Sequence, residues 1–290
     1  MNPAPPVMTS ASTAPIIHAP SIAPAPGGAP RRSVSRLHLG ARGTVARSAG
    51  YAHRRGGEMV EVRRVLVVVA HPDDAEFGCG GTVARWVADG CEVFYCLLTS
   101  GNRGSDDPAM LPERLAVVRR EEQLQAAGVL GVREVDFLGY PDGELEDTRD
   151  ARRDVVRAIR RFRPDRLVCQ NPFPSLNPYI GHRDHRTAGR LALDAVYPYA
   201  RDRLHFPEVL AEGLQPHQVR QIYLVGHDEP DVYVDITPTM DAKLRALRCH
   251  ASQVRDFAAL EARVRERAAD LGKPGGYTYA EAFRVVDLPR

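Results

Sequence analysis

The chain has 290 residues, of which 43% are hydrophobic and 26% are charged, as in an ordinary globular protein. Its formal net charge of +2 is too small to predict a nucleic-acid partner, and no apolar run reaches the roughly 18 residues of a membrane span. Its five cysteines form no CxxC pair, which predicts reduced, mostly buried thiols in a cytoplasmic protein.

The first 60 residues differ in composition from the rest. Residues 2–30 are mostly Pro, Ala, Ser and Thr, which bury too little apolar surface to offset the chain entropy of folding, and an Arg-rich stretch follows over residues 31–55. We expect no fixed structure over residues 1–60 and one folded domain over residues 61–290. One interpretation is a gene start set too early, with Met59 as the initiator. The alternatives are plain disorder, a transit peptide or a nucleic-acid-binding arm.

From residue 65 onward, apolar runs alternate with amphipathic segments. The continuous aliphatic run Val65–Val69 is typical of a strand buried on both faces of a parallel sheet. The predicted strands cover residues 65–70, 92–98, 132–138, 166–169, 221–225, 232–235 and 279–286. The predicted helices cover residues 82–89, 112–127, 150–162, 182–196, 238–249 (capped by Thr237) and 252–270. This order predicts an α/β, Rossmann-like single domain, with a mostly parallel sheet covered by helices on both faces.

Polar side chains gather where the first predicted strand ends. The segment Ala70-His71-Pro72-Asp73-Asp74 places one imidazole and two carboxylates at the sheet edge where α/β proteins bind ligands. A catalytic zinc takes three protein ligands and keeps one open position, and His71 and one aspartate would supply two of them. The segment His182-Arg183-Asp184-His185 begins a helix after the fourth strand and is placed to supply the third. A lone His-Pro-Asp is more often a capped turn, but two such clusters on one sheet predict a metal centre.

These segments resemble the motifs of the PIG-L/LmbE family, which are zinc-dependent N-acetyl-sugar (N-acetylglucosaminyl) deacetylases. The resemblance covers about residues 62–286. Further matching segments are Gly78-Cys79-Gly80-Gly81, Thr99-Ser100-Gly101, Leu138-Gly139-Tyr140-Pro141-Asp142-Gly143 and His250-Ala251-Ser252-Gln253. The resemblance implies one Zn²⁺ per chain, with other divalent transition metals as alternatives. It also implies a hydrolase that removes the acetyl group from an N-acetylated amino sugar or its conjugate.

Carried over residue by residue, the resemblance implies a role for each residue of the two clusters. The implied zinc ligands are His71, Asp74 and His185. Asp73 would be the general base that takes the proton from the attacking water. His182 would stabilise the oxyanion in its protonated form or protonate the leaving amine, and Asp184 would orient or charge a neighbouring histidine.

Four loop residues are expected to contact the substrate: Arg103, Asp107, Asp142 and Tyr179. The alternatives are a solvated loop for the first two and a simple turn for Asp142. His250 is expected to pack near the rim of the site. We expect a small N-acetyl amino sugar as the partner, with neither nucleic acid nor membrane, and leave a homo-oligomer open.

The same residues leave other functions open. An amidase of a thiol-sugar conjugate and a metal-free binding protein would share the fold. A phosphohydrolase of the HD type would need an all-helical scaffold, which the strand pattern argues against. The segment Gly78–Val83 lacks the third glycine of the dinucleotide fingerprint G-x-G-x-x-G, which argues against a nucleotide-binding module. We expect its glycines to let the following helix pack closely beneath the metal.

Overall fold

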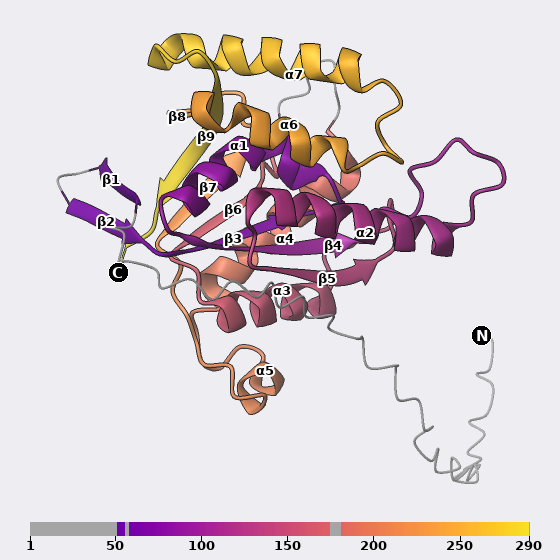
Figure 1. Cartoon of the computed structure of the whole chain (residues 1–290). Coiled ribbons are helices and arrows are strands. Elements are labelled where there is room, and N and C mark those ends of the chain that lie inside the picture. The colour runs from indigo at the N-terminus through magenta and orange to yellow at the C-terminus, as the bar shows by residue number, and fades with distance from the viewer. Residues whose placement is uncertain (1–50, 56–57, 175–180, 290) are drawn as a thin grey trace, which may run out of the picture. The chain divides into compact units, whose positions relative to one another are not determined.

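The computed structural model describes residues 51–55, 58–174 and 181–289, so the predictions for residues 1–50 and for Tyr179 lie outside the described residues. A seven-stranded sheet in the order β5-β4-β3-β6-β7-β9-β8 forms the centre of the domain (Figure 1). Its strands are β3 (Arg64–Val69), β4 (Glu92–Thr99), β5 (Glu134–Tyr140), β6 (Arg166–Gln170), β7 (Gln221–Val225), β8 (Val232–Asp235) and β9 (Ala280–Asp287).

The sheet is mostly parallel, as the sequence predicted. Strands β5, β4, β3, β6 and β7 run parallel to one another, while β9 pairs antiparallel with both β7 and β8. The predicted α/β fold class is therefore confirmed.

Helices cover both faces of the sheet. They are α1 (Asp74–Ala88), α2 (Pro112–Leu130), α3 (Arg149–Phe162), α4 (Arg183–Asp194), α5 (Pro207–Ala211), α6 (Met240–Arg248) and α7 (Phe257–Gly272). Buried side chains of α1, α2, α6 and α7 share one core cluster, and those of α3, α4 and α5 share the other. The described residues also form a π-helical turn (Ala195–Tyr199) and two 3₁₀ turns (Thr237–Thr239 and Lys273–Gly275).

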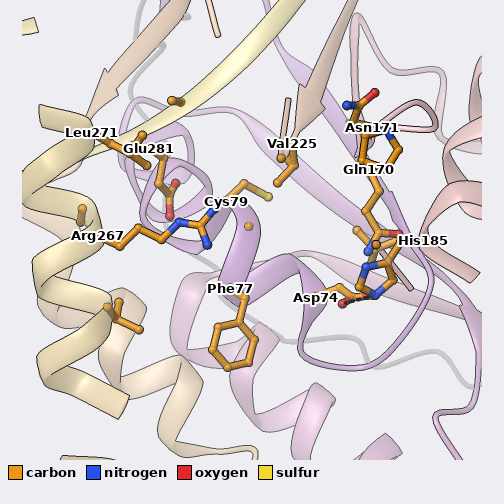
Figure 2. A pocket seen from close by; sticks show the side chains of 18 of the residues that line it. Asp74, Phe77, Cys79, Gln170, Asn171, His185, Val225, Arg267, Leu271 and Glu281 are labelled. Atoms are coloured by element: carbon orange, nitrogen blue, oxygen red, sulfur yellow. Dashed lines mark ion pairs between the residues drawn. The ribbon is translucent and has the colours of Figure 1, made fainter. Parts of the chain in front are cut away.

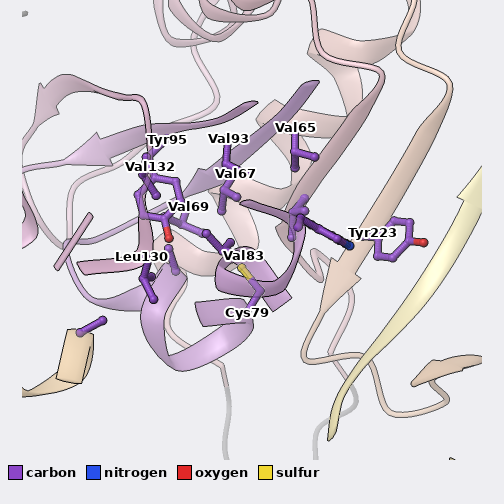
Figure 3. Close-up of a cluster of buried hydrophobic side chains, with 14 of the residues drawn as sticks. Val65, Val67, Val69, Cys79, Val83, Val93, Tyr95, Leu130, Val132 and Tyr223 are labelled. Atoms are coloured by element: carbon purple, nitrogen blue, oxygen red, sulfur yellow. The ribbon is translucent and has the colours of Figure 1, made fainter. Parts of the chain in front are cut away.

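Strand β3 lies at the centre of the sheet and contributes to both cores. Val65, Val67 and Val69 point into the cluster drawn in Figure 3, whereas Leu66 and Val68 point into the cluster on the opposite face. All five side chains are buried. The continuous apolar run thus reflects burial on both faces of the strand.

Helix α1 begins earlier than predicted, at Asp74 rather than near residue 82, and the segment Gly78–Gly81 lies inside it. The prediction of a separate glycine-rich turn was therefore wrong. Cys79 nevertheless departs from helical geometry, with φ −147° and ψ 18°, so the helix is kinked there. The kink frees backbone groups on both sides, and each of these groups needs a new partner.

A buried ion pair supplies those partners. The carboxylate of Glu281, on β9, accepts hydrogen bonds from the backbone N–H of Gly81 (3.0 Å) and of Thr82 (2.7 Å). Nζ of Lys243, on α6, donates to the backbone carbonyl of Phe77 (2.8 Å) and to Glu281 (2.5 Å). The pair therefore caps both halves of α1 at the kink.

The glycines of this segment allow α1 to pack closely against its neighbours. A Cβ at Gly81 would lie 2.8 Å from Cβ of Ile236, and one at Gly78 would lie 2.7 Å from Cγ1 of Val225. The glycines thus let α1 pack closely against Ile236 and Val225, while its expected place beneath the metal stays a prediction.

Several predicted helix boundaries were wrong. Thr237 does not cap α6, because it lies in a 3₁₀ turn and the helix starts at Met240. Helix α7 starts at Phe257 rather than near residue 252, because the side chain of Asp256 caps it by accepting from Ala259 N. Helix α5 lies between residues 196 and 221, where no element was predicted.

Two short strands, β1 (Tyr51–Arg55) and β2 (Glu58–Val62), form an antiparallel ladder. This differs from the prediction of no fixed structure up to residue 60. Tyr and Val favour extended backbone, so their presence in this stretch indicates a strand. The strand was not predicted because the stretch was grouped with the tail that precedes it.

All five cysteines are free, and four of them are buried: Cys79, Cys91, Cys96 and Cys169. Within the described residues, no helix combines the length and the apolar character that crossing a membrane requires.

Replacing Gly81 by Ala should destabilise the domain by about 1–3 kcal/mol, because the added methyl group would overlap Ile236 in a packed core. The matched control is Gly128→Ala on α2, where an added Cβ meets nothing within 4 Å. There the better helix propensity of Ala should stabilise the protein by about 0.5–1 kcal/mol. Urea unfolding of both variants tests this, and equal midpoints would refute the packing argument.

Candidate active site

The site lies where the strand order reverses. The chain runs from β3 to β4 and β5 on one side of the sheet and then returns to β6 on the other side of β3. Ligands of open α/β sheets bind at such a switch point, outside the carboxyl ends of the strands. Here the Gln170 side chain, at the end of β6, accepts a hydrogen bond from the backbone N–H of Ala70, just after β3 (3.1 Å). This hydrogen bond joins the ends of β3 and β6, the two strands that precede the predicted motifs.

The structure brings His71, Asp74 and His185 together, as expected. Nδ1 of His71 lies 3.1 Å from Nε2 of His185 and 3.3 Å from Oδ2 of Asp74, while Nε2 of His185 lies 3.1 Å from Oδ1 of Asp74. Tetrahedral ligand atoms about 2.0–2.1 Å from a zinc ion lie about 3.4 Å from one another. One carboxylate and two imidazoles at this spacing fit a Zn²⁺ site.

The other nitrogen of His71 faces two carboxylates. Nε2 lies 3.0 Å from Oδ1 of Asp142 and 3.3 Å from Oδ2 of Asp184, which also accepts a hydrogen bond from Gly143 N (2.7 Å). A proton held on Nε2 leaves Nδ1 with a lone pair directed at Asp74 and His185. The position of Asp184 fits the orienting role expected from the sequence.

Asp142 does not lie where a substrate contact would lie. It is only 7% exposed, and its carboxylate contacts His71 instead of facing an open cavity. Its backbone N–H donates to the Asn102 side chain (3.0 Å), which ties the turn after β5 to the loop after β4. The sequence does not reveal this role, because a Pro-Asp-Gly segment is typical of an ordinary turn.

The charges around His71 favour a cation. Burial lowers the pKa of His71, but hydrogen bonds to Asp142, Asp184 and Asp74 outweigh it and raise that pKa to about 11. Burial raises the pKa of Asp74, but its bonds to His185 and His71 outweigh this and hold the pKa well below its usual range. The negative charges of Asp74, Asp142 and Asp184 therefore favour binding of a cation, such as a divalent metal ion.

A second group of potential ligands, His71 with Asp142 and Asp184, lies on the Nε2 side. Asp184 is completely buried there and already accepts the Gly143 N–H. In contrast, Asp74 and His185 line an open cavity. Because a catalytic metal needs a position that water and substrate can reach, the Nδ1 side suits it better.

Asp73 points away from its neighbour Asp74. Its φ of 95° lies in the left-handed region, and its backbone N–H donates to the Gln123 side chain (2.9 Å). Its carboxylate accepts a hydrogen bond from Nη2 of Arg119 (3.0 Å). This turn separates the two carboxylates, so Asp74 meets the two imidazoles while Asp73 remains clear of them.

Burial and the negative charge of Asp74 raise the pKa of Asp73 to about 7, against the opposing charges of Arg119, His250 and His71. A carboxylate with a pKa near neutrality can both accept and return a proton. The environment of Asp73 therefore suits the general-base role expected from the sequence.

A buried polar network that sequence analysis missed lies behind Asp73. Gln123 donates to Glu76 (2.9 Å), and the other oxygen of Glu76 lies 3.2 Å from Nε2 of His250. His250 is completely buried, so its expected place at the rim was wrong. One signal was available, because Arg119 and Gln123 follow the buried Leu115 of α2 at four-residue spacing.

His182 is the N-cap of α4 and lies beside the proposed metal ligands. Its ring centroid is 4.7 Å from that of His71, and its Nδ1 accepts the backbone N–H of Asp184 (3.2 Å). Burial and the charge of His71 lower its pKa. Because Nδ1 accepts a hydrogen bond, the neutral ring carries its proton on Nε2, and the lowered pKa favours this form as a donor to an oxyanion over a charged acid.

Figure 2 shows the cavity that opens beside this cluster. It has a volume of about 560 Å³, with Asp74 and His185 on one side and residues of β9 and α7 on the other. A second cavity of about 640 Å³ is lined by Arg103, Ser252 and Gln253. Phe77 lines both cavities.

The expected substrate contacts in the loop after β4 do not line the cavity beside Asp74 and His185. Arg103 lines the second cavity, and its side chain forms an ion pair with Glu144. Asp107 lines neither of these two cavities, and its carboxylate caps the backbone N–H of Ala109 (2.9 Å).

Known proteins resemble this chain closely. A diacetylchitobiose deacetylase from Thermococcus kodakarensis is 36% identical over 228 residues, which cover 78% of this chain and 84% of that protein. The family model PIG-L, described as GlcNAc-PI de-N-acetylase, matches residues 66–196. The chain belongs to the PIG-L family. This membership confirms the predicted enzyme class, a hydrolase that acts on an amide bond.

Solved structures of other proteins have a fold similar to that of this chain. The N,N′-diacetylchitobiose deacetylase from Pyrococcus horikoshii, in complex with its inhibitor MPG, has a TM-score of 0.74 and 34% identity, covering 78% of this chain and 85% of that one. GalB, a 4-carboxy-2-hydroxymuconate hydratase from Pseudomonas putida, has a TM-score of 0.65 and 26% identity, covering 79% and 97%. Similar folds thus serve different reactions, and the reaction of each protein depends on the residues of its site.

Replacing Asp142 by Asn should weaken Zn²⁺ binding about 10–100-fold, because the amide cannot hold His71 in the required tautomer as a carboxylate does. Competition with a chromophoric chelator measures the affinity. Asp150→Asn, an exposed aspartate at the start of α3, is the matched control and should bind Zn²⁺ as the wild type does. Equal affinity in both variants would mean that Asp142 does not position His71 for metal binding.

Proposed function

We propose that this PIG-L protein is a Zn²⁺-dependent deacetylase of N-acetylated amino sugars or their conjugates. The observation that carries the proposal is the separation of two adjacent carboxylates. Asp74 lies within 3.1–3.3 Å of two imidazole nitrogens, while Asp73 is turned away and held by Arg119. The first arrangement suits a metal ligand and the second suits a proton acceptor.

The residues that would hold the ion are His71, Asp74 and His185. A Zn²⁺ ion in such a site lowers the pKa of a bound water to about 7 and polarises the carbonyl oxygen of a substrate. Two imidazoles and one carboxylate form a donor set that zinc commonly takes in hydrolases, with a position left open.

Asp73 accepts the proton of the water that attacks the acetyl carbonyl. His182 donates its Nε2–H to the carbonyl oxygen as that oxygen gains negative charge, a contribution typically worth 10²–10³-fold in rate. The amide nitrogen must gain a proton before acetate and amine can separate, and Asp73, with a pKa of about 7, can return the proton it took.

Arg119 and Gln123 keep Asp73 in position during this exchange. Arg119 binds the carboxylate of Asp73 and the backbone carbonyl of Gly101 (3.0 Å), and Gln123 holds its backbone N–H. The left-handed turn is thus fixed from both sides, and the carboxylate stays clear of the metal position.

The substrate class follows from the relatives. Names among them include diacetylchitobiose deacetylase and N-acetyl-alpha-D-glucosaminyl L-malate deacetylase, which share an N-acetylglucosamine unit. We therefore propose an N-acetylglucosamine-type substrate. The five free cysteines support a cytoplasmic location.

Replacing Asp73 by Asn should lower kcat about 10²–10⁴-fold while the protein keeps its Zn²⁺, because the amide cannot accept the proton. The assay measures free amine released from a panel of N-acetylglucosamine derivatives by zinc-loaded protein. Metal content is measured on the same samples, so that loss of base and loss of metal can be separated.

Chelation of the metal is the companion measurement. Wild-type protein stripped by a chelator should lose activity and regain it with Zn²⁺, whereas stripped and reloaded Asp73→Asn should stay inactive. Full acetate release by zinc-loaded Asp73→Asn would show that the assigned base is wrong. Full activity of the stripped wild type would overturn the metal-dependent mechanism.

A further inference from the structure

The far side of the cavity is formed by helix α7, which the mechanism does not use. Arg263 and Arg267 lie four residues apart, on the same face of α7, and both line the cavity. In Figure 2 Arg267 points into the cavity from α7, opposite Asp74 and His185. A molecule that reaches from the metal ligands across the cavity would meet these guanidinium groups.

The two arginines have no acidic partner in the part of the chain that the structure describes. Among the described residues, neither Arg263 nor Arg267 makes a hydrogen bond or an ion pair, although Arg265 on another face of the same helix pairs with Glu261 (2.9 Å) and Asp241 (3.1 Å). An arginine of α7 can therefore pair with acidic side chains, as Arg265 does, whereas Arg263 and Arg267 do not pair with any described residue.

The acidic side chains of the cavity are already engaged. Asp74 is bound to two imidazoles, and Glu281 is bound to Lys243 (2.5 Å) and to backbone N–H groups. The cationic residues that line the cavity are Arg186, Lys243, Arg263 and Arg267. Positive charge exceeds negative charge in a partly enclosed space, which favours an anionic ligand.

The middle of the cavity is apolar. In Figure 2 Val225 and Phe77, which is 42% exposed, lie between Arg267 on one side and Asp74 and His185 on the other. At about 560 Å³, the cavity lies within the range typical of sites for small organic molecules. It can hold more than an acetamido group, with a charged group at the far end.

We propose that the cavity is a subsite for an anionic aglycone, so that the substrate is an N-acetylglucosamine conjugate bearing a carboxylate or a phosphate group. This rests on the proposed deacetylase function, which places the N-acetyl group at His71, Asp74 and His185. Arg263 and Arg267 bind the anion, since guanidinium groups match both carboxylate and phosphate geometry. The pair makes this end of the cavity a determinant of specificity.

Three aryl N-acetylglucosaminides with a para carboxylate, a para phosphate or a para carboxamide group test the proposal. The carboxamide is the neutral isostere of the carboxylate. We expect kcat/KM of wild-type protein to be about tenfold or more higher for at least one anionic glycoside than for the carboxamide. Arg263→Gln/Arg267→Gln should reduce this ratio to about 1. Arg265→Gln, the control on the same helix, should keep it.

A binding measurement separates this inference from the proposed reaction. Calorimetry with the Asp73→Asn protein, which should not turn the glycosides over, should show tighter binding of an anionic glycoside, and loss of that preference when both arginines are replaced. Binding preference without turnover by wild-type protein would refute the deacetylase reaction and leave the anion subsite standing.

The opposite results would refute the proposed anion subsite. Deacetylation of all three glycosides at similar kcat/KM, or a preference that survives in a folded Arg263→Gln/Arg267→Gln protein, would show that α7 does not bind an anion. Thermal unfolding of each variant, followed by circular dichroism, establishes that it is folded.

Discussion

The site depends on the way in which a single imidazole is held. Asp142 and Asp184 take the Nε2 side of His71, so its Nδ1 lone pair faces Asp74 and His185. These residues come from turns after β3 and β5 and from the start of α4, and the parallel sheet brings them to one edge. The carboxylates of Asp142 and Asp184 lie on the Nε2 side of this ring, and that of Asp74 lies on the Nδ1 side, where we propose that the metal binds.

The site also requires the side chains of Asp73 and Asp74 to point apart, and residues far from both in the sequence hold them in this arrangement. A left-handed φ at Asp73 would be unfavourable without the contacts of Arg119 and Gln123 from α2. Helix α1, which starts at Asp74, is kinked at Cys79 and capped there by an ion pair from α6 and β9. The C-terminal third of the chain therefore supports a site whose main motifs lie in the first two thirds.

Much of this was predictable from the sequence, for identifiable reasons. The run Val65–Val69 is buried on both faces, so its hydrophobicity predicted the central strand. Two short motifs of chemically distinctive residues predicted that His71, Asp74 and His185 lie together. Asp142 and His250 were misplaced because a turn motif and a lone histidine do not show which distant group they will contact. The kink in α1 was missed because its cap, Glu281, lies 200 residues from Gly81.

Anomalous diffraction at the zinc edge from crystals of the zinc-loaded protein tests the metal centre most directly. The account predicts a single peak about 2.0–2.2 Å from His71 Nδ1, His185 Nε2 and a carboxylate oxygen of Asp74, with Asp73 outside the coordination sphere. A peak on the other side of the His71 ring, coordinated by Nε2 with Asp142 and Asp184, would contradict it. So would a peak that Asp73 coordinates, because a carboxylate bound to the metal cannot serve as the base.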